Sequence, residues 1–172
     1  QYDNARNTVR NLSRFYRTSL SSGRTIITIK EELELIRNYI FIEQIRYEDL
    51  FDVVYQLDER VNHAKIVTLT LQPLIENAIY HEIKEKGGKG IIVISTMLAG
   101  GRVQLRIEDD GQGGEQALFD RLLQTKSEDE KKSFGISGTI LRLQYFFEGD
   151  CSVSFRSAVG QGTRVTISFP LR

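Results

Sequence analysis

Hydrophobic residues recur at helical spacing in the first part of the chain. Apolar side chains in residues 2–16 follow one another at intervals of three and four, which is the seam of a helix that packs against another helix: Tyr2, Ala5, Val9, Leu12 and Tyr16. The segment "SLSSGRT" interrupts this pattern. A second helix with a broad apolar face is predicted over residues 31–46, opened by Glu31 and Glu32.

The pattern changes to alternation near residue 50, where "LFDVVYQLD" predicts a β-strand. The segment "LQPLIENAIYHEI" predicts a further helix over 71–83. We therefore expect a boundary near Tyr47, which separates a helical part from the rest of the chain. The other predicted elements are a hairpin around "AGG" (87–111), a mobile polar loop with a short helix (115–132), a helix from about Thr139 and a closing hairpin (151–172).

This order of elements predicts an α+β fold. Helices that share one antiparallel or mixed sheet form a two-layer α/β sandwich, because each apolar helix face must be buried against the sheet. The division after residue 47 gives a helical stub, 1–47, and a sandwich domain, 48–172.

Composition narrows the possible partners and compartments. Lys plus Arg and Asp plus Glu are 23 each in the 172 residues, so no overall charge attracts the chain to nucleic acid or anionic lipid. The single cysteine, Cys151, excludes an internal disulfide and suits a reducing compartment. The longest purely aliphatic run, "IIVI", is too short for a membrane span. We expect a cytoplasmic piece of a longer protein, because the chain begins within a helical pattern.

The stretch "IEDDGQGG" (107–114) has two interpretations. Asp-Gly between apolar segments is a common turn signal. Two adjacent carboxylates, Asp109 and Asp110, followed by several glycines exceed what a two-residue turn needs and indicate a binding site.

The helix over 71–83 carries polar residues on the face opposite its apolar stripe. At α-helical spacing these are Pro73, Glu76, Asn77, Tyr80, His81 and Lys84. A solvated helix surface is the alternative interpretation. Further along, "FGISG" precedes an apolar helix and offers an unobstructed helix N-terminus, which favours anions. A nucleotide with magnesium needs a carboxylate for the base, oxygen ligands for the ion and N–H groups for phosphates, and these elements supply all three.

The motifs resemble the catalytic domain of histidine kinases, whose fold is shared with the gyrase, Hsp90 and MutL ATPases (the GHKL superfamily, with a Bergerat-type ATP-binding fold). "LQPLIENAIYHEI" is similar to the N box, "IEDDGQGG" to the Asp-Asn-Gly-x-Gly box, "FGISGTILRL" to the second glycine box and "GQGTRVTISFP" to the terminal Gly-x-Gly-Thr element. The upstream "LSRFYRTSL", "EELELIRNYI" and "QIRYED" resemble the branch of sensor histidine kinases typified by LytS and YehU.

The resemblance implies roles for individual residues. Asp109 would bind the adenine amine, Thr163 would support that contact through a water, and Asn77 would bind Mg²⁺. Glu76 takes the acidic place beside Asn77, and His81 the imidazole place at the end of the box, for which a helix residue without chemical function is the alternative. Three glycines would make room for ATP under a lid of residues 115–134: Gly111, Gly113 and Gly135.

Several positions depart from the family pattern. Asp110 stands where Asn is usual and adds negative charge near the base, and Ser133 and Gly138 replace a Gly and an Asn of the second glycine box. The phosphoacceptor motif of the family is absent, because the only histidines are His63 and His81.

The sequence therefore predicts the ATP- and Mg²⁺-dependent catalytic domain of a two-component sensor histidine kinase. The resemblance implies that residues 1–47 are part of a dimerisation region whose phosphoacceptor helix is missing. It further implies a membrane-anchored homodimer with this part in the cytoplasm, and a response regulator as partner. The alternatives are a serine kinase or ATPase of the same fold, and a degenerate nucleotide-binding or interaction module.

Overall fold

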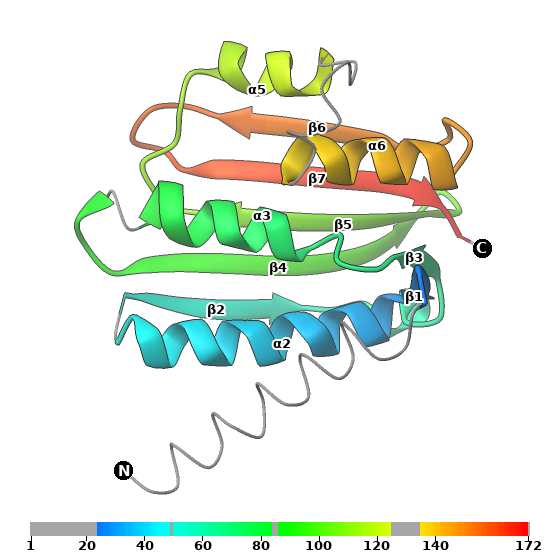
Figure 1. Ribbon diagram of the computed structural model, residues 1–172, viewed down its shortest axis with the longest axis horizontal. Helices are drawn as coiled ribbons and strands as arrows, with labels where there is room; N and C mark the ends of the chain where they lie inside the picture. Colours follow the sequence, from blue (N-terminus) through cyan, green and yellow to red (C-terminus); the bar gives the residue numbers. More distant parts are fainter. Residues whose placement is uncertain (1–23, 49, 84–85, 125–134, 172) are drawn as a thin grey trace, which may run out of the picture.

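The computed structural model describes residues 24–171, except 49, 84–85 and 125–134. Its centre is a five-stranded mixed sheet (Figure 1), in which β2 runs parallel to β4 and every other pair is antiparallel. Alternate residues of the central strands are buried, as the sequence pattern predicts for a sheet with one covered face. The strands in spatial order are β2 (Phe51–Gln56), β4 (Gly90–Ala99), β5 (Arg102–Asp109), β7 (Thr163–Pro170) and β6 (Ser152–Ser157).

Three helices cover one face of this sheet, and a fourth packs at its β6 edge (Figure 1). This confirms the predicted two-layer α+β architecture. The helices are α2 (Ile29–Arg46), α3 (Gln72–Asn77) and α6 (Ile136–Phe146) on the face, and α5 (Gln116–Gln124) at the edge. None of the helices in the described ranges is long and apolar enough to span a membrane.

A small second sheet, which the sequence analysis did not predict, joins β1 (Ile26–Thr28) to β3 (Lys65–Val67). A 3₁₀ turn, η1 (Glu59–Val61), precedes β3. Thr28 then caps α2, because its hydroxyl accepts from the Glu31 N–H while the Glu31 carboxylate accepts from the Thr28 N–H. The helix therefore begins at Ile29, two residues before the predicted start.

The helix α2 belongs to the same hydrophobic core as the sheet. Leu35, Ile36 and Ile40 are at most 3% exposed and cluster with β-strand residues such as Ile92 and Ile94. The predicted functional division after residue 47 stays a prediction, and the predicted helix over 2–16 lies outside the described residues.

The helix predicted over 71–83 is not α-helical throughout. It is α-helical as α3 to Asn77 and continues as a π-helical segment, η2 (Ala78–Ile83). A π turn takes about one residue more than an α turn, so side chains after Asn77 are displaced around the axis. The single predicted polar stripe is therefore interrupted at Tyr80, which points to α2 and donates to Glu43. The side chain of His81 and residue Lys84 lie outside the described part of the structure.

The helix α6 begins at Ile136 rather than near Thr139. Gly135 precedes it with φ of 131°, a conformation that side chains rarely adopt. Gly138, which suggested loop in the sequence, is buried inside the helix. The predicted loop after Glu115 contains the expected short helix, α5, while 125–134 lie outside the described residues.

Phe147 anchors the end of α6 in the core. It is fully buried, and its ring stacks on that of Phe169 with centroids 4.6 Å apart. We expect Phe147→Ala to lower the free energy of unfolding by about 3–5 kcal/mol, measured by urea denaturation, because it leaves a cavity. Tyr145, which is 90% exposed, is the matched control. Tyr145→Ala should change the free energy of unfolding by less than about 0.5 kcal/mol, and equal losses would contradict the packing argument.

Candidate functional site

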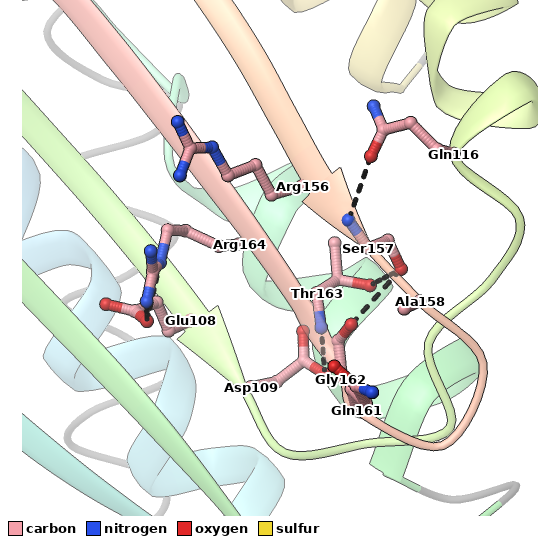
Figure 2. Close-up of a pocket in the computed structure, with 10 residues that line it drawn as sticks. All are labelled: Glu108, Asp109, Gln116, Arg156, Ser157, Ala158, Gln161, Gly162, Thr163 and Arg164. Carbon is pink, nitrogen blue, oxygen red and sulfur yellow. Dashed lines mark hydrogen bonds and ion pairs between the residues drawn. The ribbon is translucent and has the colours of Figure 1, made fainter.

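The candidate site is built on adjacent ends of β5 and β7. The two strands are antiparallel, and their register pairs Asp109, the last residue of β5, with Thr163, the first of β7. The Asp109 Oδ1 atom accepts from the backbone N–H of Gly111 (2.9 Å) and of Thr163 (3.2 Å). Figure 2 shows the second of these bonds. The carboxylate is therefore held by the backbone of the turn that follows it and by the neighbouring strand.

Two glycines allow the loops at this end of the sheet to approach one another. Gly113 and Gly162 have φ of 62° and 77°. A side chain on Gly162 would clash with the carbonyl oxygen of Asp109, and one on Gly113 would clash with that of Ala158. Gly111, by contrast, is buried but has no positive φ. The glycines of "DDGQGG" and "GQGT" thus serve the turn and the site together.

Ser157 at the end of β6 connects these loops, and the sequence analysis missed it. Its hydroxyl accepts from the Gly114 N–H (2.8 Å) and lies 3.1 Å from the Gly162 carbonyl oxygen and 2.9 Å from Thr163 Oγ1. Because a carbonyl only accepts, Thr163 donates to Ser157 when the serine proton goes to Gly162. Thr163 is buried, so its hydroxyl is fixed by this contact.

Gln116, also missed, attaches α5 to the edge strand. Its side-chain Oε1 accepts from the Ser157 N–H at 3.0 Å (Figure 2). Its Nε2 donates to the Phe155 carbonyl at 2.9 Å, so the Gln116 amide makes the backbone hydrogen bonds that a further strand would make at this edge. Phe119 of α5 stacks on Phe155 with ring centroids 5.4 Å apart. No local sequence pattern marks Ser157 or Gln116 as part of the site, because polar side chains at a sheet edge are normally exposed to solvent.

The N-box residues lie on the helix layer above β5. Leu74 and Ile75 are buried, while Glu76 and Asn77 are half-buried, so the polar pair faces away from the core as predicted. Glu76 accepts from the Gln72 side chain at 2.8 Å. The η2 segment that follows contacts β5. His81 lies in η2, but its side chain is outside the described part of the structure.

Asp110, the acidic residue that departs from the family motif, is bound by groups other than those that hold Asp109. Its Oδ1 accepts from the Ile91 N–H (2.8 Å), and its Oδ2 lies 2.9 Å from Lys86 Nζ. Burial raises the pKa of this carboxyl, but the Ile91 N–H and Lys86 together lower it by more than burial raises it. The pKa therefore lies below its usual value. Lys86 therefore compensates the added negative charge.

A polar cavity of about 310 Å³ opens beside Asp109 (Figure 2). Gly162 and Thr163 line it together with Glu108 and Arg164, and Arg164 Nε donates to Glu108 at 2.6 Å. Glu108 and Arg164 alternate with buried residues of β5 and β7, so this part of the cavity lies on the sheet face that the helices leave uncovered. Asn77 and Glu76 are not among its lining residues. The structure thus joins Asp109, Thr163 and the glycines directly, while the N box is contributed by a separate layer.

Comparison with known proteins identifies this arrangement. Residues 62–172 match the family described as "Histidine kinase-, DNA gyrase B-, and HSP90-like ATPase", and residues 1–51 match the family described as "Histidine kinase". The sensor histidine kinase YpdA of Escherichia coli is 41% identical over 121 residues, which are 70% of this chain and 21% of that protein. The chain belongs to the sensor histidine kinase family.

Other relatives agree with this membership. The sensor histidine kinase YesM of Bacillus subtilis is 30% identical over 95% of the chain and 27% of its own length, so the chain spans about a quarter of these kinases. The fold is also that of the catalytic domain of histidine kinase ThkA, with a TM-score of 0.60, 13% identity and coverage of 86% of this chain and 97% of that one. A kinase domain from Erythrobacter litoralis gives a TM-score of 0.57 at 18% identity, over 99% of this chain and 76% of that one.

In this histidine kinase domain, Gly162 should be intolerant of any side chain. We expect Gly162→Ala to lower the free energy of unfolding by roughly 2–5 kcal/mol, because a positive φ and a backbone clash act together. Gly160 is the matched control, since its φ is also 77° but nothing lies near the added carbon. Gly160→Ala should cost about 1–2 kcal/mol from backbone strain alone. Equal losses in urea denaturation would contradict the close approach of Gly162 to Asp109.

Proposed function

We propose that this chain is the Mg·ATP-binding catalytic domain of a two-component sensor histidine kinase. ATP use follows from the family, and the positions of the individual contacts are our proposal. The observation that supports them best is the Asp109 carboxylate, which two backbone N–H groups hold at the end of β5, between the loops that carry Gly113 and Gly162. Gly113 and Gly162 allow the loops to close around this carboxylate, because backbone carbonyls fill the space that a side chain would need at either position.

Asp109 would select adenine over guanine. A carboxylate only accepts hydrogen bonds, and adenine presents an amine donor where guanine presents a carbonyl. Thr163 would assist through a water, with its hydroxyl oriented by Ser157. Gly111, Gly113 and Gly135 would leave room for the nucleotide, and residues 115–134 would cover it.

Asn77 would bind Mg²⁺. This ion usually keeps several waters and is bound through one or two protein oxygens together with substrate phosphates, so a single amide is an adequate contribution. Magnesium would neutralise the phosphate charge and orient the γ-phosphoryl. Glu76, beside Asn77, would take the acidic place of the N box, and His81 the imidazole place at its end.

For the whole protein, we propose transfer of the γ-phosphoryl to a histidine outside this chain and then to a response regulator. Phosphoryl transfer depends on positioning and charge neutralisation, which loops and helix ends provide. We further propose a homodimer anchored in the membrane by other segments, with residues 1–47 in its dimerisation region and this part in the cytoplasm.

We expect Asp109→Asn to weaken binding of a non-hydrolysable ATP analogue by roughly ten- to a hundredfold, through loss of a charge-assisted hydrogen bond worth about 1.5–3 kcal/mol. Calorimetric titration in the presence of Mg²⁺ measures this change. The exposed Asp52→Asn, on β2 and away from the site, is the control and should bind as the wild type does. Equal affinity of the wild type for ATP and GTP analogues would contradict the role of Asp109.

Incubation with γ-labelled ATP should leave this chain unlabelled. His63 and His81 are its only histidines; His63 lies in an exposed turn after η1, and His81 lies within the N-box segment. A phosphoacceptor must meet the γ-phosphate in line at about 3–3.5 Å, which a residue of the site wall cannot do. A peptide that carries the acceptor helix should restore acid-labile label in trans. Label on the chain alone that disappears in His63→Ala or His81→Ala would contradict this proposal, and acid-stable label would favour a serine kinase.

A further inference from the structure

Two glutamates of α2 are buried on one face of the helix. Glu32 and Glu43 are 1% and 5% exposed. They lie three turns apart, since three α-helical turns take about 11 residues, and therefore project from the same side of α2. Burial of a carboxylate is costly unless it is hydrogen-bonded. Each of the two is bonded to the segment that carries the N box.

Glu32 holds the start of that segment. Its Oε2 accepts from the Leu69 N–H (3.0 Å) and its Oε1 from the Leu71 N–H (2.8 Å). Leu69 has φ of 59°, a left-handed conformation that is unfavourable for leucine, and Leu71 is the N-cap residue of α3. Burial raises the pKa of the Glu32 carboxyl, and the two N–H groups partly offset this effect. The carboxylate thus fixes a strained turn immediately before α3.

Arg142 of α6 holds the same turn from its other side. Its guanidinium donates to the carbonyl oxygens of Thr68 (2.9 Å) and Leu69 (3.1 Å). The N–H groups of the turn are therefore bound by a carboxylate, and its carbonyls by a cation. The helices α2 and α6, which are distant in sequence, therefore both bind the turn that precedes α3.

Glu43 holds the other end of the segment. The Tyr80 hydroxyl, in the π-helical part, donates to Glu43 Oε2 at 2.7 Å and accepts from Arg46 Nη1 at 3.1 Å. The ring of Tyr47 packs edge-on against that of Tyr80, with centroids 5.8 Å apart. Burial and the Glu43 carboxylate raise the pKa of Tyr80, so the hydroxyl keeps its proton and remains a donor.

We propose that Glu32 and Glu43 are positioning residues, which attach the N-box segment to α2 at both ends and thereby fix the position of Asn77. This inference rests on the proposed function. Asp109 and Thr163 are fixed by the sheet, whereas Asn77 lies between Leu71 and Tyr80, the two points attached to α2. The position of Asn77, which we call the magnesium side of the site, thus depends on α2. The positions of Asp109 and Thr163, the adenine side, do not.

Two ligands test the magnesium side and the adenine side separately. We would measure dissociation constants of this chain for a non-hydrolysable ATP analogue with Mg²⁺ by calorimetry, and for adenosine by NMR titration. Glu32→Gln and Tyr80→Phe should each weaken binding of the Mg²⁺ complex about tenfold, in the range of mutations that alter coupling between sites. Adenosine affinity should change by less than about twofold, since the sheet contacts remain. Glu34→Gln, on the exposed face of the same helix, is the control and should change neither constant.

The outcomes distinguish the inference from the function on which it rests. Loss of affinity for both ligands in parallel, together with a lower melting temperature, would show a general effect on the fold and overturn the positioning role. Unchanged affinity for the Mg²⁺ complex in both variants would also overturn it. Tyr80→Phe removes a single oxygen, so it keeps the test decisive if Glu32→Gln unfolds. A wild-type chain that binds neither ligand would contradict the proposed function itself.

Discussion

The contact between the backbone of Gly162 and the carbonyl of Asp109 is the constraint on which the site depends. It brings the loop before β7 against the loop after β5, and only a residue without a side chain permits the approach. The Thr163 N–H then lies within hydrogen-bond distance of the Asp109 carboxylate, and Ser157 can reach Gly114, Gly162 and Thr163 together. The stretch "IEDDGQGG" is therefore a turn and a site for the same reason, because the turn is what fixes the carboxylate.

Local sequence information was sufficient for the residues whose position depends on strand alternation or on a turn. Ile107 and Asp109 are two residues apart and face the same side, so the carboxylate was predictable at the end of a buried strand. The "AGG" hairpin was predictable because its two glycines, with φ of 57° and 74°, satisfy the turn directly. The buried face of α3 followed from helical spacing up to Asn77. In each case the determining contacts lie within a few residues of the chain.

The missed features depend on contacts between distant segments. Ser157 was unrecognisable because its importance arises from the β6–β7 register and from Gly114, which lies far away in sequence. Glu32 resembled an ordinary acidic residue in the first turn of a helix, and only the tertiary structure reveals that it accepts from Leu69 and Leu71. The π turn after Asn77 has no signature in residue spacing, since the same residues also suit an α-helix. Local patterns thus identify the candidate binding residues but not the residues, such as Ser157 and Glu32, that hold them in position.

The two layers of the candidate site differ in the hydrogen bonds that attach them. Asp109 and Thr163 belong to β5 and β7, whose paired backbone bonds run along both strands, so displacement of Asp109 requires disruption of a ladder. The N box is joined to α2 by side chains, namely one carboxylate on two N–H groups and one tyrosine on a second carboxylate. A typical hydrogen bond contributes a net free energy of roughly 0.5–1.5 kcal/mol, so these side-chain bonds orient a segment that Leu74, Ile75 and Ile79 already anchor in the shared core. Because α2 lies within residues 1–51, the part of the chain that matches the "Histidine kinase" family, its two buried glutamates join that part directly to the segment that carries Asn77.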